Sequence, residues 1–172
     1  MTESILFETS RLAFRPVLME DAPAIFKMCS NPEVLKFTAD FPPLNIRASE
    51  KVIRENIWKQ YQMHGFGRWV VVLKSTGEFT GWCGLKYRPE REAVDIGYRF
   101  DQPYWGQGIA TEAAEKCLHI GFDKYNLDFI IGCAFAGNVA SIRVLENIGM
   151  KFKKHFILYN TKSVWYEKWR DE

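Results

Sequence analysis

The chain has 172 residues, of which 47% are hydrophobic, and 23 basic and 21 acidic residues give it a formal net charge of +2. This length and composition suffice for one buried core, so we expect a single domain over residues 1–172. The charges form no basic run, no apolar stretch reaches the roughly 20 residues of a membrane span, and the first residues lack a signal-peptide pattern, so we expect a cytoplasmic protein that binds neither nucleic acid nor membrane.

The N-terminal third predicts one strand and two helices. Arg11–Pro16 alternates polar and apolar residues, which is typical of a half-buried strand. A short helix is predicted over Asp21–Met28, with its first residue as N-cap. The segment 31–43 contains three prolines and is expected to be a loop with at most one helical turn. Apolar residues recur at helical spacing over Arg47–Met63, and Gly65 is placed to end this second helix.

Three strand-like segments follow, and short turns separate them. They cover Arg68–Leu73, Phe79–Tyr87 and Ala93–Phe100. The sequence Ser-Thr-Gly at 75–77 is typical of a tight turn, and residues 88–92 separate the second and third segments. Strands joined by such short connections predict an antiparallel meander.

The C-terminal part alternates helices and strands. We expect a helix over Gly108–Lys124, a strongly apolar strand over Phe129–Phe135 and a helix over Asn138–Ile148, which Asn138 caps. Two strands, Lys151–Leu158 and Ser163–Lys168, close the chain after a short turn. A helix that connects two strands favours their parallel pairing.

The predicted order is therefore β-α-α-β-β-β-α-β-α-β-β. It indicates an α/β fold of the mixed α+β kind, with one mostly antiparallel sheet of about seven strands flanked by four helices. The four cysteines, Cys29, Cys83, Cys117 and Cys133, form no C-x-x-C pair, and the three histidines do not stand at metal-ligand spacing. We expect buried thiols and no metal.

A glycine-rich turn joins the third strand of the meander to the next helix. Its sequence over 106–111 is Gly-Gln-Gly-Ile-Ala-Thr. Glycine lets the backbone approach a ligand closely, and free N–H groups at a helix start favour an anion such as phosphate. A dinucleotide fingerprint would need Gly or Ala at Thr111, and a Walker A loop would need Gly-Lys-Ser or Gly-Lys-Thr. A plain glycine turn without ligand is the structural alternative.

These residues resemble the GNAT superfamily of N-acetyltransferases, in its RimJ/RimL-like branch. Gly108 and Ala110 match the last two fixed positions of the GNAT signature, whereas Trp105 departs from the first and resembles the Tyr-Trp-Gly of that branch. The resemblance extends over nearly the whole chain. Its further motifs are the strand Val94–Tyr98, the Thr-Glu-Ala at 111–113 and the helix sequence from Asn138 to Gly149.

The resemblance implies direct transfer of the acetyl group of acetyl-CoA to a primary amine, without an acyl-enzyme or a metal. In this family the cofactor phosphates lie on the glycine-rich loop, and the pantetheine arm pairs with an exposed strand edge between two diverging strands. The implied cofactor-binding residues are Tyr98, Arg99, Phe100, Gly106, Gln107, Gly108, Ile109, Ala110, Thr111 and Asn138. Asn138 can equally be a plain N-cap.

The resemblance also suggests two catalytic residues. Asp95 stands where some GNAT enzymes carry an acidic base, and its short side chain favours action through a water; it can equally be an ordinary solvent-facing strand residue. Many relatives place a proton-donating tyrosine where this chain has Leu145. Ser141 is then the candidate that assists the departing thiolate, with a capping-box role as its structural alternative.

The family resemblance places acceptor specificity in 31–56 and His155–Trp165, where Phe37, Asp40 and Phe41 are the candidate acceptor-binding residues. The acceptor, a protein N-terminus or a small-molecule amine, stays open, and we expect a monomer or a homodimer. A catalytically silent GNAT fold that binds acyl-CoA or an amine is the alternative function.

Overall fold

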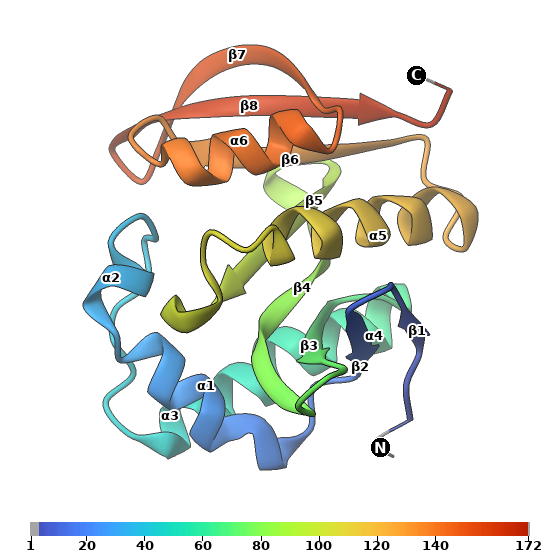
Figure 1. The fold of residues 1–172 in the computed structure, drawn as a ribbon. Helices are drawn as coiled ribbons and strands as arrows, with labels where there is room; N and C mark the ends of the chain where they lie inside the picture. Colours follow the sequence, from blue (N-terminus) through green and yellow to red (C-terminus); the bar gives the residue numbers. More distant parts are fainter. Residues whose placement is uncertain (1–3, 172) are drawn as a thin grey trace.

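The structure, a computed structural model, describes residues 4–171, and these fold around one eight-stranded sheet (Figure 1). The strand order is β1-β2-β3-β4-β5-β6-β8-β7, and every neighbouring pair is antiparallel except β5 and β6. The strands are β1 (Phe7–Glu8), β2 (Leu12–Arg15), β3 (Arg68–Leu73), β4 (Glu78–Arg88), β5 (Ala93–Phe100), β6 (Phe129–Phe135), β7 (Lys151–Leu158) and β8 (Thr161–Trp169). The mixed, mostly antiparallel sheet is confirmed. The sequence missed β1, because two residues are too short to show a period.

The helices also follow the predicted order. They are α1 (Ala22–Cys29), α2 (Pro32–Leu35), α3 (Ile46–Val52), α4 (Trp58–His64), α5 (Ile109–Asp123) and α6 (Val139–Asn147). A π-helical segment, Ile53–Ile57, joins α3 to α4, so the two form the single helix expected over Arg47–Met63. Gly65 ends this helix in the left-handed conformation, with φ of 75°. The short α2 is the one turn expected in 31–43.

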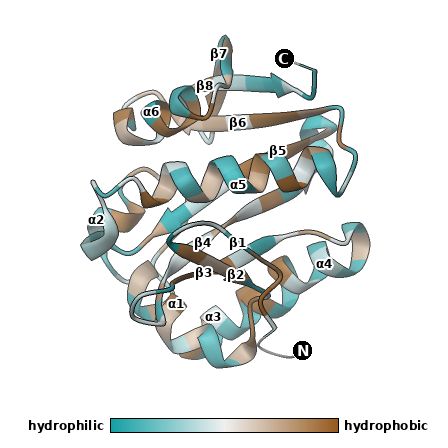
Figure 2. Ribbon diagram, turned by 45° about the vertical axis from the view of Figure 1, so that its right-hand side comes forward, coloured by the Kyte–Doolittle hydropathy of each residue, from teal (hydrophilic) through white to brown (hydrophobic). Residues whose placement is uncertain are grey.

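Helices cover both faces of the sheet (Figures 1 and 2). Helices α5 and α6 lie on one face, and α1, α3 and α4 lie on the other. Residues of β4 alternate between the two sides: Cys83 and Leu85 belong to the core beneath α5, whereas Trp82 packs against the core beneath α1. Figure 2 shows hydrophobic residues gathered on the central strands and hydrophilic ones on the outer sides of the helices.

One correction concerns Asp21, which was expected to cap α1. Its position before the helix is as predicted, but its side chain makes no cap bond. Instead the two carboxylate oxygens accept hydrogen bonds from Arg15 at 2.7 and 2.8 Å, and Oδ2 also accepts from the backbone N–H of Leu18 at 2.8 Å. The Arg15–Asp21 pair connects β2 to the start of α1. The sequence pattern could not show that the carboxylate would bind an arginine six residues earlier in place of the helix N–H groups.

The parallel strands β5 and β6 meet over only two residue pairs. These pairs are Asp95 with Ile131 and Ile96 with Gly132. Strand β5 stays paired with β4 as far as Phe100, and β6 stays paired with β8 as far as Phe135. The two strands therefore part after the junction, and no strand of residues 4–171 pairs with the edge of β5 over 97–100 that faces away from β4.

The Arg15–Asp21 pair predicts a measurable loss of stability. Asp21→Ala removes the carboxylate that accepts from Arg15 and Leu18, and breaking such a largely buried pair typically costs about 3 kcal/mol or more in the free energy of unfolding. For a chain of this size we expect the melting temperature to fall by about 6 to 12 °C. Asp123→Ala, an exposed site on α5, is the control and should change the unfolding free energy by less than about 0.5 kcal/mol. Equal chemical-denaturation midpoints for the two variants would contradict the anchoring role.

Candidate active site

A cleft of about 500 Å³ opens where β5 and β6 part. All five residues that the sequence singled out for catalysis and acceptor binding line it, together with three of the expected cofactor-binding residues, and these eight come from three separate parts of the chain. They are Phe37, Asp40, Phe41, Asp95, Tyr98, Arg99, Asn138 and Ser141. The glycine-rich loop and Phe100 do not line this cleft. The loop lies beyond the end of β5, at the start of α5.

The glycine-rich loop has the geometry of an anion cradle. Gly106 and Gly108 adopt left-handed conformations with φ of 71° and 75°, and α5 begins directly afterwards. Among the described residues, no backbone carbonyl or side chain accepts a bond from the N–H groups of residues 106–111. A Cβ at Gly106 would meet nothing within 4 Å. The free N–H groups and open space at a helix N-terminus therefore fit a pyrophosphate.

Two side chains hold this loop in place. Trp105 donates its indole N–H to the carbonyl of Phe100 at 2.8 Å, which fixes the loop against the end of β5. Arg11 donates to the carbonyl of Gln107 at 2.9 Å and pairs with Glu112 at 2.6 Å. Sequence reasoning missed Arg11, because nothing local in the sequence links two segments about a hundred residues apart.

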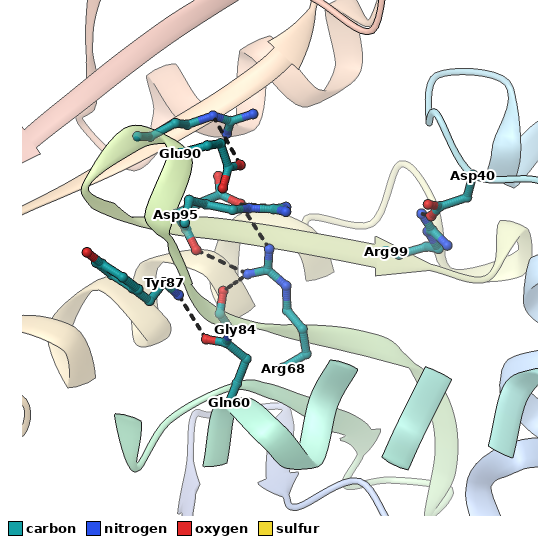
Figure 3. Close-up of polar contacts among 10 residues, drawn as sticks. Asp40, Gln60, Arg68, Gly84, Tyr87, Glu90, Asp95 and Arg99 are labelled. Carbon is teal, nitrogen blue, oxygen red and sulfur yellow. Dashed lines mark hydrogen bonds and ion pairs between the residues drawn. The ribbon is translucent and has the colours of Figure 1, made fainter. Parts of the chain in front are cut away.

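Asp95 is buried in an ion-pair network on the acceptor side of the sheet (Figure 3). Its Oδ2 atom accepts from Arg68 Nη2 at 3.1 Å and from Arg88 Nε and Nη2 at 3.3 Å. Arg68 also donates to the carbonyls of Gly84 and Asp95. The reading of Asp95 as a solvent-facing residue is wrong, since only 4% of it is exposed. The alternation of residues along β5 could not reveal that arginines on two other strands, Arg68 on β3 and Arg88 on β4, reach Asp95.

Glycine makes this network possible. Arg68 lies on β3, two strands away from Asp95, so its side chain must cross β4 and reach β5. A Cβ at Gly97 would collide with the guanidinium of Arg68. The guanidinium therefore occupies the volume that a side chain at position 97 would fill.

On the opposite face of β5, the hydroxyl group of Tyr98 contacts that of Ser141 on α6. Tyr98 Oη lies 2.9 Å from the carbonyl oxygen of Ser141 and 2.9 Å from its Oγ. Burial raises the pKa of Tyr98, so the phenol holds its proton near neutral pH. Asn138 caps α6 by accepting the N–H of Ser141 at 3.1 Å. The hydroxyl of Ser141 thus contacts Tyr98 and is not a capping-box partner of Asn138, and Leu145 lies buried against Gly132.

The side chain of Arg99 points to the acceptor side of the cleft. Its Nη2 pairs with Asp40 at 2.5 Å (Figure 3). Its guanidinium lies over the ring of Trp82, 5.3 Å from the ring centroid. Only the backbone of Arg99 therefore remains for the cofactor role implied by the family resemblance. Phe41 is 91% exposed on the same loop as Asp40, at the mouth of the cleft.

Cys133 differs from the other three cysteines. Cys29, Cys83 and Cys117 are buried, as expected, whereas Cys133 is only partly buried; both Cys133 and Cys29 line the cleft. It lies on β6 just beyond the junction, where β5 no longer covers the strand edge. Burial still raises the pKa of its thiol to about 12. Over residues 4–171 no three His, Cys, Asp or Glu side chains group as metal ligands, and no helix is long and apolar enough to cross a membrane.

The crossing of Arg68 over Gly97 predicts strong coupling between these two positions. Gly97→Ala should lower the free energy of unfolding by about 1 to 3 kcal/mol, since the added methyl group displaces the guanidinium from Asp95. In an Arg68→Ala background the same change should cost less than about 0.5 kcal/mol. A double-mutant cycle from urea unfolding measures this coupling. Additive effects would show that Arg68 does not hold the position described.

Comparison with known proteins identifies the family of this chain. The family model for the acetyltransferase (GNAT) domain matches residues 11–151. The chain is 32% identical over 166 residues to the uncharacterized protein YkkB of Bacillus subtilis, which covers 93% of each chain. Its fold is similar to that of a GNAT-family acetyltransferase from Bacillus anthracis, with a TM-score of 0.83, 23% identity and coverage of 96% of this chain and 98% of that chain. It is likewise similar to RimL, a ribosomal α-N-protein acetyltransferase in complex with coenzyme A, with a TM-score of 0.83, 18% identity and coverage of 98% and 99%. This chain therefore belongs to the GNAT family of acetyltransferases.

Proposed function

We propose that the chain transfers the acetyl group of acetyl-CoA directly to a primary amine, on a small molecule or at a protein N-terminus. The observation that carries this proposal is the unpaired edge of β5 over 97–100, which adjoins the Tyr98–Ser141 hydroxyl pair in one cleft. An exposed strand edge offers N–H and C=O groups that an extended amide chain can satisfy. The similarity in fold to RimL, whose structure holds coenzyme A, supports the same site here.

Three parts of the chain would hold acetyl-CoA. The free N–H groups of 106–111 would bind its pyrophosphate, and the backbone of Gly97–Phe100 would pair with the pantetheine arm. Asn138 lines the cleft and orders the start of α6. Acetyl-CoA supplies the activated acyl group and a thiolate leaving group. The residues of the chain then have to bind and orient the two substrates. They also have to handle two protons: the one that the amine loses and the one that the leaving thiolate gains.

Ser141 and Tyr98 are suited to assist the leaving thiolate. The phenol hydrogen of Tyr98 can go to the Ser141 carbonyl, in which case Ser141 Oγ donates to Tyr98 until a stronger acceptor develops. A serine hydroxyl is too weak an acid to protonate a thiolate alone, so the pair acts as hydrogen-bond donor and relay. The Tyr98–Ser141 pair thereby takes the place of the acid that is missing at Leu145.

Asp95 is the candidate that accepts the amine proton. Both arginines bond to its Oδ2, whereas Oδ1 accepts no bond from any described residue. A water on Oδ1 would place a proton acceptor at the cleft, which suits the short aspartate side chain.

A thiol-release assay tests the proposed function. Wild-type protein with acetyl-CoA and a panel of peptides, polyamines, amino acids and aminoglycosides should release free thiol with at least one amine. Binding of acetyl-CoA without release in any arm would favour the catalytically silent alternative.

We predict that acetyl-CoA stabilises the folded chain through the glycine-rich loop. A ligand bound only by the native state at a hundredfold excess over Kd adds about 2.7 kcal/mol, which thermal unfolding detects. Gly108→Val should abolish this shift, because valine does not tolerate φ of 75°. Gly77→Val is the matched control: it has φ of 71° and open space, but it lies in the turn between β3 and β4. An equal shift with NAD, or loss of the shift in both variants, would sink the assignment of the loop.

We predict that Ser141→Ala lowers kcat by about 30- to 1,000-fold, the usual value of one donor that acts mainly in the transition state. The Kd for acetyl-CoA, measured by calorimetry, should change little. Tyr98→Phe should also lower kcat, because it removes the group that orients Ser141 Oγ. If Ser141→Ala lowers only the melting temperature and leaves kcat intact, the hydroxyl pair is structural.

A further inference from the structure

The acceptor side of the cleft contains more cations than anions. Its charged lining residues are Arg68, Lys86, Arg88, Arg99, Asp40 and Asp95. Asp40 neutralises Arg99, and Asp95 is shared by Arg68 and Arg88 through a single oxygen. Four basic groups thus face two carboxylates, and no other acidic or histidine side chain lines the cleft within the described chain.

Lys86 is the one cation of the cleft that has no ion-pair or hydrogen-bond partner among the described residues. It lies on β4 directly opposite Asp95 of β5, and the alternation of the strand directs it to the side opposite Leu85, whose side chain packs beneath α5. Among the described residues no carboxylate oxygen lies within 4 Å of its ammonium group, and no hydrogen-bond acceptor contacts it. Burial, with Arg88 and Arg68 nearby, lowers the pKa of Lys86. The nearby carboxylates of Asp95 and Glu90 act in the opposite direction but do not outweigh burial and the arginines, so the half-buried ammonium has no carboxylate of the described chain in direct contact.

Arg88, which lies beside Lys86, is a second cation that has a free hydrogen-bond donor. Its Nε and Nη2 contact Asp95 at 3.3 Å, and Nη1 has no acceptor among the described residues. Its side chain is 26% exposed and lines the cleft, so it is accessible to a ligand. Arg88 and Lys86 lie two residues apart on one strand and therefore face the same side.

We propose that the acceptor amine also carries a carboxylate, which binds between Lys86 and Arg88. This inference rests on the proposed acetyl transfer and names its substrate class. An ammonium and a guanidinium make charge-assisted hydrogen bonds to a carboxylate, and such bonds are strongest in partly buried sites. The carboxylate has two sources with the same chemistry: the α-carboxylate of a free amino acid, or an acidic side chain next to a peptide N-terminus.

Matched acceptor pairs test this proposal. The first arm compares glycine, serine and aspartate with their α-amides; the second compares N-terminal serine peptides that carry Asp or Asn as the second residue. We expect kcat/KM to be at least about tenfold higher for the carboxylate member in one arm, the size expected for one hydrogen bond to a charged group. The arm that shows the preference identifies the source.

Lys86→Gln should bring the ratio of kcat/KM for the acid to kcat/KM for the amide close to one. The comparison of the two proteins cancels the different basicities of the acid and amide amines. Lys59→Gln, an exposed lysine of α4 that does not line the cleft, is the control and should keep the wild-type preference. A preference that survives Lys86→Gln, or equal kcat/KM for acid and amide in both arms of the wild type, overturns the proposal.

A binding measurement separates this proposal from the proposed function. The N-acetylated form of the preferred acid, or N-acetylserine if no acceptor reacts, should raise the melting temperature of the wild type more than that of Lys86→Gln. Its amide should affect both proteins equally. Absence of thiol release with every amine would contradict acetyl transfer alone, whereas equal shifts for acid and amide in the wild type would contradict the carboxylate site alone.

Discussion

The short junction between β5 and β6 is the constraint on which the site depends. Each strand is fully paired on its other side, β5 with β4 and β6 with β8, so neither can bend back to close the gap after Ile96 and Gly132. Leu145 of α6 packs against Gly132 at this point and keeps the helix beside the opening. The carbonyl of Phe100 accepts from Trp105, and the backbone groups of 97–99 that face away from β4 must then find partners in water or in a ligand.

The divergence of β5 and β6 also brings the functional groups on the two faces of β5 into one cleft. Neighbouring residues of β5 point to opposite faces, so Tyr98 contacts α6 while Asp95 and Arg99 face the acceptor loops. In a closed sheet these faces would stay separate. Because the cleft passes between the strands, a thioester lying on the edge of β5 can reach a hydroxyl pair on one side and an amine on the other.

The sequence predicted most of the architecture because local signals determine it. Strong periodicity and flanking turns set the bounds of β3, β5, β6 and β7 to the residue, and glycines marked the loop before α5. The family motif led to Ser141 and Asp95. The partners of these residues could not be predicted: Arg68 reaches Asp95 across 27 positions and Tyr98 reaches Ser141 across 43, and neither distance leaves a periodic or local trace.

The charges of the cleft bear on the reaction as a whole. During acetyl transfer an ammonium loses its positive charge and the sulfur gains a negative one, so the bound reactants become more negative in both steps. Surroundings with excess positive charge favour each change, since they destabilise the ammonium and stabilise the developing thiolate. Lys86 and the two arginines that share the single carboxylate of Asp95 supply that excess. A carboxylate on the acceptor would use part of it for binding, and the amine would then need only a weak proton acceptor, such as a water on Asp95.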